Sequence, residues 1–235
     1  MLRVGAITVF AMALWGMIVE SSSAEEGTAL TESELETLLD ELEGTLGTLK
    51  TVQVSFVQEK HLAIFRDVVR AEGSLYFSSP DSLRFEITRP FRSVLVARGR
   101  SVAQYEFIEG QWEKLRTGGG QVILMVTGQI GAWMRGRFRE QNGMYSISAR
   151  EEDLTHVILT PKDEELARHI SRIEIVLSEA HSNIVRLEIH ESRGDYTSIT
   201  FFAHGHNVEL PDAIFRTSGP MPSEVEGRTP KSASH

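Results

Sequence analysis

Cysteine is absent from the 235-residue chain, and basic residues are outnumbered by acidic ones. A protein without disulfides must be held by its hydrophobic core, which a chain of this length can build. A bacterial lipid anchor also needs a cysteine directly after the signal, so we expect an unanchored mature protein. The 33 acidic and 24 basic residues give a net charge of −9, which disfavours nucleic acids and anionic membranes as partners.

Long apolar runs are also missing, with one exception near the start of the chain. Arg3 precedes an apolar run from Val4 to Val19, and Ser21-Ser22-Ser23-Ala24 follows it. A basic start, a short apolar segment and small residues before a cleavage point are typical of a secretory signal peptide. We therefore predict a cleaved signal at residues 1–24 and export to a Gram-negative-type periplasm; an uncleaved membrane anchor is the alternative.

The clearest helix is predicted from Thr31 to Leu49, where leucines recur at spacings of three and four and acidic residues fill the other face. Thr31 and Glu34 have the spacing of a capping box. From Thr51 onward the apolar residues alternate with polar ones, which indicates strands with one apolar and one wet face. Turn signals about every ten residues predict eleven short strands: 51–59, 73–77, 82–88, 93–97, 101–107, 111–114, 144–148, 155–160, 172–177, 185–190 and 196–202.

The last three strands are joined by connections too short for helices, so we expect an antiparallel meander. The segment from Gln121 to Arg135 breaks the strand pattern, because it is very apolar and is interrupted by glycines. We interpret it as one or two short, mobile helices that cover the apolar face of the sheet. One domain is predicted over residues 25–217, followed by a disordered tail at residues 218–235.

Catalytic patterns are weak throughout the chain. Gly99-Arg100-Ser101-Val102-Ala103 lacks the second glycine of a nucleophile elbow and reads as a hairpin turn. Gly118-Gly119-Gly120 lacks the lysine and hydroxyl residue of a phosphate loop. Acidic runs at 151–153 and 163–165 are typical of solvated loops. We therefore predict no catalytic residue and no cofactor.

Histidines offer one candidate metal site, in His204-Gly205-His206 with His190 on a neighbouring strand. A metal centre would need further ligands, and none stands at a suitable spacing. We interpret this segment as a polar turn and predict no metal.

Several motifs stand in a fixed order along the chain. The early helix runs into Val54-Ser55-Phe56-Val57-Gln58-Glu59-Lys60 and is followed by Gly73-Ser74-Leu75-Tyr76-Phe77. Leu83-Arg84-Phe85-Glu86 and Leu159-Thr160-Pro161-Lys162 come later, with the meander behind them. In this order and spacing the motifs resemble the LolA family, the periplasmic carriers of outer-membrane lipoproteins, and the resemblance covers most of residues 44–215.

The resemblance implies a mainly β fold: an incomplete, half-open antiparallel β-barrel of about eleven strands, covered by short helices over an apolar cavity. Its implied partners are acylated lipoprotein or lipid cargo, an inner-membrane ABC-type releasing complex and an outer-membrane receptor. A monomer would suit such a shuttle. The helices predicted at residues 121–135 would form a lid over this cavity, and Arg84 is the candidate polar residue that holds the lid closed. The candidate cavity residues, which could equally be ordinary core, are Phe56, Leu75, Leu83, Phe85, Leu124, Met125, Ile130 and Trp133.

One position departs from the best-known carriers, which have an arginine before the proline where this chain has Ser79. This difference indicates a divergent branch of LolA-like proteins, often tied to other lipids or lipid-linked pigments. The alternative function is a lipid-sensing regulatory module like the RseB-type proteins, although those carry a further C-terminal domain. A lipid hydrolase using Ser101 is a third and weaker hypothesis.

Overall fold

The computed structural model describes residues 27–64, 67–115, 128–141 and 143–217. The predicted signal peptide and the predicted C-terminal tail lie outside the described residues. The chain divides into two compact units. The first consists of Met1–Gly47, Gln58–Arg70 and Arg135–Thr200, and the second of Thr48–Val57, Ala71–Met134 and Phe201–His235.

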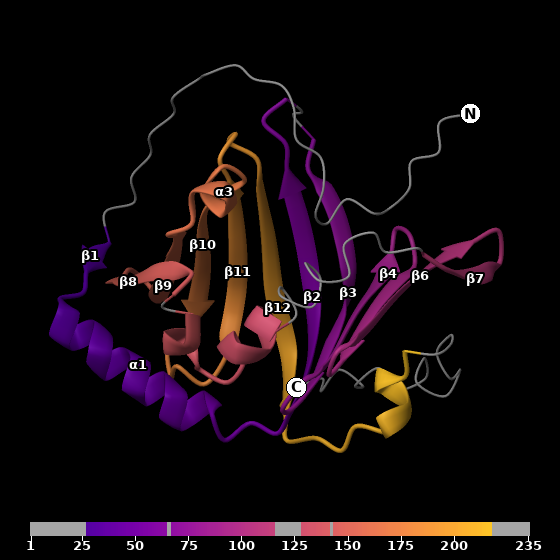
Figure 1. The fold of residues 1–235 in the computed structure, drawn as a ribbon, viewed down its shortest axis with the longest axis horizontal. Coiled ribbons are helices and arrows are strands. Elements are labelled where there is room, and N and C mark those ends of the chain that lie inside the picture. Colours follow the sequence, from indigo (N-terminus) through magenta and orange to yellow (C-terminus); the bar gives the residue numbers. More distant parts are fainter. Residues whose placement is uncertain (1–26, 65–66, 116–127, 142, 218–235) are drawn as a thin grey trace, which may run out of the picture. The chain divides into compact units, whose positions relative to one another are not determined.

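Twelve strands form one antiparallel sheet in the order β1-β8-β9-β10-β11-β12-β2-β3-β4-β5-β6-β7 (Figure 1). The sheet is not closed, because β1 and β7 are both edge strands, and this confirms the predicted open, mainly β fold. All eleven predicted strands are present, while the two-residue β1 was missed. The strands are β1 (Thr28–Ala29), β2 (Thr51–His61), β3 (Val69–Ser78), β4 (Ser82–Arg89), β5 (Ser93–Arg98), β6 (Ser101–Ile108), β7 (Gln111–Lys114), β8 (Tyr145–Glu151), β9 (Thr155–Pro161), β10 (Ile170–Leu177), β11 (Ile184–Glu191) and β12 (Tyr196–His206).

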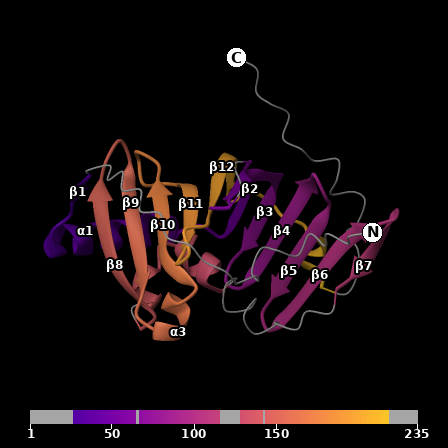
Figure 2. The same ribbon diagram turned by 90° about the horizontal axis from the view of Figure 1, so that it is seen from above.

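Helix α1 (Glu32–Leu46) lies alongside β8 to β11 and covers the hydrophobic side of these strands in the first unit (Figures 1 and 2). Its N-terminus has the predicted capping box, in which the Thr31 hydroxyl accepts from Glu34 N–H and the Glu34 carboxylate accepts from Thr31 N–H. Of the leucines at this helical spacing, five are buried and Leu35 is half-buried. The buried ones are Leu38, Leu39, Leu42, Leu46 and Leu49.

The segment after residue 135 contacts α1 at two places, through the backbone of Gly136 and the side chain of Arg139. Gly136 has φ +68°, and a side chain there would meet the Leu42 carbonyl oxygen at 2.2 Å, so only glycine allows this approach. Arg139, in the short 3-10 helix η1 (Phe138–Gln141), pairs with Glu36 at 2.7 Å and Asp40 at 2.8 Å. A one-turn helix, α3 (Glu164–Ala167), lies where an acidic loop was predicted.

In the second unit, strands β3 to β7 follow one another side by side (Figure 2). One of their faces is covered by the 3-10 helix η2 (Asp212–Phe215), whose Ile214 and Phe215 pack with Tyr76, Val94 and Val96. The opposite face carries the predicted cavity residues. None of the described helices has the length and apolar composition needed to cross a membrane.

Candidate lipid-binding face

The candidate site is the face of β3, β4 and β5 that points away from η2. Strand register places Leu75 opposite Phe85 and Phe77 opposite Leu83, and Phe85 is also opposite Leu95 on β5. Since side chains directly across an antiparallel pair share a face, these five residues form one apolar surface. We call this surface the apolar face.

Phe56 of β2 adds a sixth side chain to the apolar face, and its ring lies next to Gly73 of β3. Its ring stacks on that of Phe85, with ring centroids 4.3 Å apart and an interplanar angle of 19°. A side chain at Gly73 would lie 2.6 Å from the tip of the Phe56 ring and 1.9 Å from the Glu86 carbonyl oxygen. Glycine at position 73 therefore makes the room that the Phe56 ring fills.

The four strand residues predicted for the cavity thus come together on one surface. Phe56, Leu75 and Leu83 are buried, whereas Phe85 is half-buried and Leu95 beside it is too. Phe56, Leu75 and Leu83 are as buried as core residues. Among the four, Phe85 is the one whose aromatic ring is still accessible to a ligand.

Part of the predicted lid lies over the same face. Residues 128–133 are helical, and a side chain at Gly131 would meet the Phe77 ring at 3.2 Å, so this helix packs directly on the apolar face. Trp133 is buried and Ile130 is half-buried. Leu124 and Met125 lie outside the described residues.

Arg84 points to the opposite face of β4 from Leu83 and Phe85. Its Nε lies 3.1 Å from Glu86 Oε2, and its Nη1 donates to the Ile214 carbonyl oxygen at 3.2 Å. Burial lowers the pKa of this guanidinium, and the neighbouring Glu86 carboxylate opposes that effect. The partners that the structure gives Arg84 are therefore Glu86 and the C-terminal segment, and its role as a latch for residues 121–135 stays a prediction.

Three buried polar atoms among the described residues of the second unit are without a hydrogen-bond partner: Arg84 Nη2, the Glu106 carboxylate oxygen Oε1 and the Trp133 indole nitrogen. The last two belong to the candidate site. Glu106 lies opposite Ser93, which in turn faces Ile87, so its side chain belongs to the rim of the apolar face. Burial raises the pKa of its carboxyl group. A protonated carboxyl and an indole N–H could each donate a hydrogen bond to a carbonyl oxygen.

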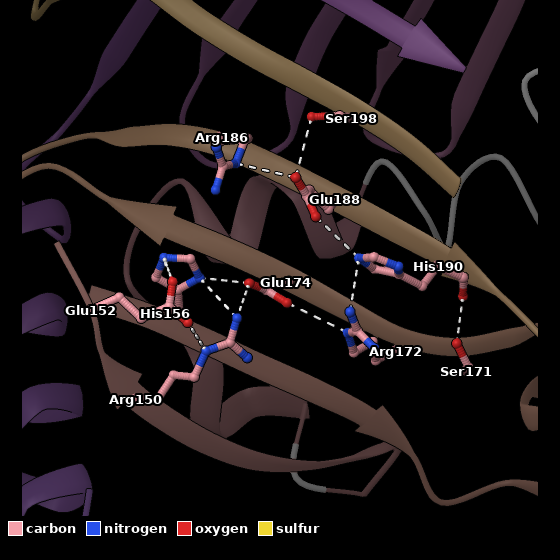
Figure 3. A network of polar contacts seen from close by, with 10 residues as sticks. All are labelled: Arg150, Glu152, His156, Ser171, Arg172, Glu174, Arg186, Glu188, His190 and Ser198. Carbon is pink, nitrogen blue, oxygen red and sulfur yellow. Dashed lines mark hydrogen bonds and ion pairs between the residues drawn. The ribbon is translucent and has the colours of Figure 1, made fainter. Parts of the chain in front are cut away.

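The first unit carries a second polar cluster, an ion-pair network on the face of β8 to β11 that turns away from the α1 leucines (Figure 3). Glu174 is its centre: its carboxylate lies 2.5 Å from His156 Nδ1 and 2.7 Å from Arg150 Nη2. Glu174 and His156 are only 3% and 4% exposed. The predicted wet face of these strands is therefore buried at Glu174 and His156.

Three side chains of this network could be considered as metal ligands. Glu174, Glu188 and His190 each place a ligand atom within 4.8 Å of the others, as the single such group in the described parts of the chain. However, Arg172 Nε lies 3.4 Å from Glu174 and Arg186 Nε lies 3.2 Å from Glu188. Guanidinium groups already bind both carboxylates and would repel a cation, so the arrangement suits an ion-pair network rather than a metal centre.

The other residues considered for chemistry occupy turns and strand ends. Ser101 is exposed at the start of β6, directly after the β5–β6 turn, as expected for a hairpin. The rings of His204 and His206 lie 6.1 Å apart at the end of β12, and burial lowers the pKa of His206. Neither place brings a nucleophile and a base together among the described residues.

Comparison with known proteins gives one family. The family model described as outer membrane lipoprotein carrier protein LolA matches residues 47–218. A carrier protein of that name from Methylococcus capsulatus is 22% identical over 93% of this chain and 95% of its own length. Another from Dechloromonas aromatica is 24% identical over 80% of this chain and 87% of its own. Similar solved structures include a LolA superfamily protein from Nitrosomonas europaea, with 13% identity, a TM-score of 0.40, and coverage of 77% of this chain and 96% of the other.

Proposed function

Because the chain belongs to the LolA family of outer membrane lipoprotein carrier proteins, we propose that it is a periplasmic carrier of acyl chains. It binds the acyl chains of lipoproteins or related lipids on the apolar face and moves them from the inner to the outer membrane. An inner-membrane ABC-type complex would supply the cargo and an outer-membrane receptor would accept it. The family consists of carriers rather than enzymes, so no catalytic step is needed.

The observation that carries this proposal is the apolar face itself. It gathers Phe56, Leu75, Leu83 and Phe85 on three strands and has a short helix packed on it at Phe77. Burial of each methylene of an acyl chain is worth about 0.8 kcal/mol, so transfer between two such surfaces costs little net free energy. A six-residue helix that begins at Gly128 and contains Gly131 is suited to move aside and admit a chain.

A pair of matched variants tests the site. Phe85→Ala removes a half-buried ring from the apolar face, and we expect it to weaken binding of a fluorescent acylated peptide about tenfold. Val94→Ala removes a buried side chain from the opposite face of the same sheet, so it should lower stability without changing affinity. Equal affinity of both variants and the unmodified protein would place the acyl chain elsewhere.

The cargo itself can be identified by native mass spectrometry of the protein purified from its own periplasm. A bound acylated protein would indicate lipoprotein carriage, and a free lipid or lipid-linked pigment would indicate the divergent branch. Retrieval of one stoichiometric membrane regulator, without uptake of any acylated cargo, would instead support the regulatory function.

A further inference from the structure

Exposed large apolar side chains gather at one end of the second unit. Phe91 is 61% exposed, and Phe107 and Ile108 are each 37% exposed. Phe91 lies in the β4–β5 turn, while Phe107 and Ile108 end β6 just before the β6–β7 turn. Consecutive antiparallel strands place these two turns at the same end of the sheet. The turns are also joined directly, because Phe107 N–H donates to the Arg92 carbonyl oxygen at 3.0 Å.

A tryptophan and an arginine complete this group. The Trp112 ring packs edge-on against Phe107, with ring centroids 5.4 Å apart. The Arg92 guanidinium lies 4.9 Å from the centroid of Phe107 and 5.1 Å from that of Trp112, within the range of a cation–π interaction. We call these five residues, Phe91, Arg92, Phe107, Ile108 and Trp112, the aromatic tip.

We propose that the aromatic tip inserts into the surface of a lipid bilayer. Its composition is that of a membrane interface, where tryptophan and other aromatic rings sit at headgroup level and arginine keeps its charge in water. Phe91 and Ile108 stand at turns, where single side chains can enter lipid without a shaped partner surface. The backbone at a turn stays outside the hydrocarbon, so it needs no partners there.

The position of the tip also favours lipid as the occupant. Strand β4 carries Leu83 and Phe85 on the apolar face and ends at Arg89, about 13 Å beyond Phe85 for an extended chain. A tip anchored in the bilayer would thus hold the apolar face close to the lipid from which an acyl chain is taken or into which it is released. The argument from position rests on the proposed function, whereas the flotation experiment is independent of it because no cargo is present.

Electrostatic attraction is not what brings the aromatic tip to the bilayer. The chain has a net charge of −9, and Glu109 and Glu113 flank the tip. We therefore expect binding to neutral vesicles, with little dependence on salt, in contrast to an electrostatic association.

The test is flotation of the exported protein with phosphatidylcholine vesicles at low and high salt. The unmodified protein should float with the vesicles in both, and Phe91→Ser/Ile108→Ser should reduce its partition coefficient about tenfold or more. The control is Phe202→Ser, which removes an exposed ring from β12 and should leave flotation unchanged; its exposure of 47% lies between those of Phe91 and Ile108. All proteins are compared at the same N-terminus, confirmed by mass, so that other membrane-binding segments cannot produce a difference.

A second readout keeps the result independent of folding. Brominated lipid should quench the Trp112 fluorescence, and Trp112→Phe should remove that quenching. Trp112 is half-buried and also packs against the cluster under η2, so the thermal unfolding midpoint of the variant is measured beside it. Equal flotation of the double variant and the unmodified protein would overturn the proposal. It would also be overturned if the unmodified protein ignores vesicles but self-associates through these residues, since the tip would then join two copies of this chain. Failure of acyl binding alone would contradict the proposed function and leave this inference standing.

Discussion

The ion pair between Arg84 and Glu86 gives the sharpest prediction about stability. Both side chains are buried, at 3% and 10% exposure, and their closest atoms lie 3.1 Å apart. They project from β4 into the apolar cluster under η2, where register places Tyr76 and Val96 on either side of Arg84. A charge in such surroundings is stable only while its partner is present.

Arg84→Met keeps the volume and removes the charge, which leaves the Glu86 carboxylate buried and unpaired. We expect this change to lower the free energy of unfolding by about 3–5 kcal/mol. Since a urea m-value of about 2 kcal/mol per molar is typical, the unfolding midpoint should fall by roughly 2 M. The double variant Arg84→Met/Glu86→Leu replaces the pair by apolar residues and should be about as stable as the unmodified protein, or more stable.

Urea unfolding followed by circular dichroism measures all three proteins. Arg89→Met is the matched control, because Arg89 lies on the same strand and pairs with Glu72 but is 75% exposed; it should cost about 1 kcal/mol or less. The reasoning is refuted if Arg84→Met behaves like the control, or if Arg84→Met/Glu86→Leu is at least as unstable as Arg84→Met. Either result would mean that solvent reaches the pair.

Three further predictions concern other parts of the fold. Burial raises the pKa of Glu106 above its ordinary value of 4.5, so the protonated form is lost as the pH rises through the raised pKa. Glu106→Gln should therefore gain stability relative to the unmodified protein as the pH rises above 4.5, and a difference in unfolding free energy that does not change with pH would contradict this. Gly73→Ala should disturb the strand and the packing of Phe56, because the new side chain would lie 1.9 Å from the Glu86 carbonyl oxygen and 2.6 Å from the Phe56 ring; a normal thermal unfolding midpoint would show that the strand can shift. Thr31→Ala removes the N-cap of α1 and should cost about 1 kcal/mol in unfolding free energy, whereas Thr31→Ser should restore it.

The sequence was enough to predict local structure, because local structure depends on periodicity. Alternation of apolar and polar residues located eleven strands and the final meander, and leucine spacing with Thr31 and Glu34 located α1 and its cap. The two-residue β1 was missed, since two residues are too few to show a period. The same alternation placed Leu75, Leu83 and Phe85 on one surface, which the strand register confirms.

The tertiary structure alone decided which polar residues are buried. On β4, Leu83 and Phe85 face one way and Arg84 and Glu86 the other, and yet both faces are covered. Glu174 looked like a solvated residue in an alternating strand, but side chains from β8 and β9 enclose it. A sequence shows the face on which a side chain lies. It does not show what covers that face, because the covering elements, such as η2 above Arg84, come from distant parts of the chain and are brought there only by folding.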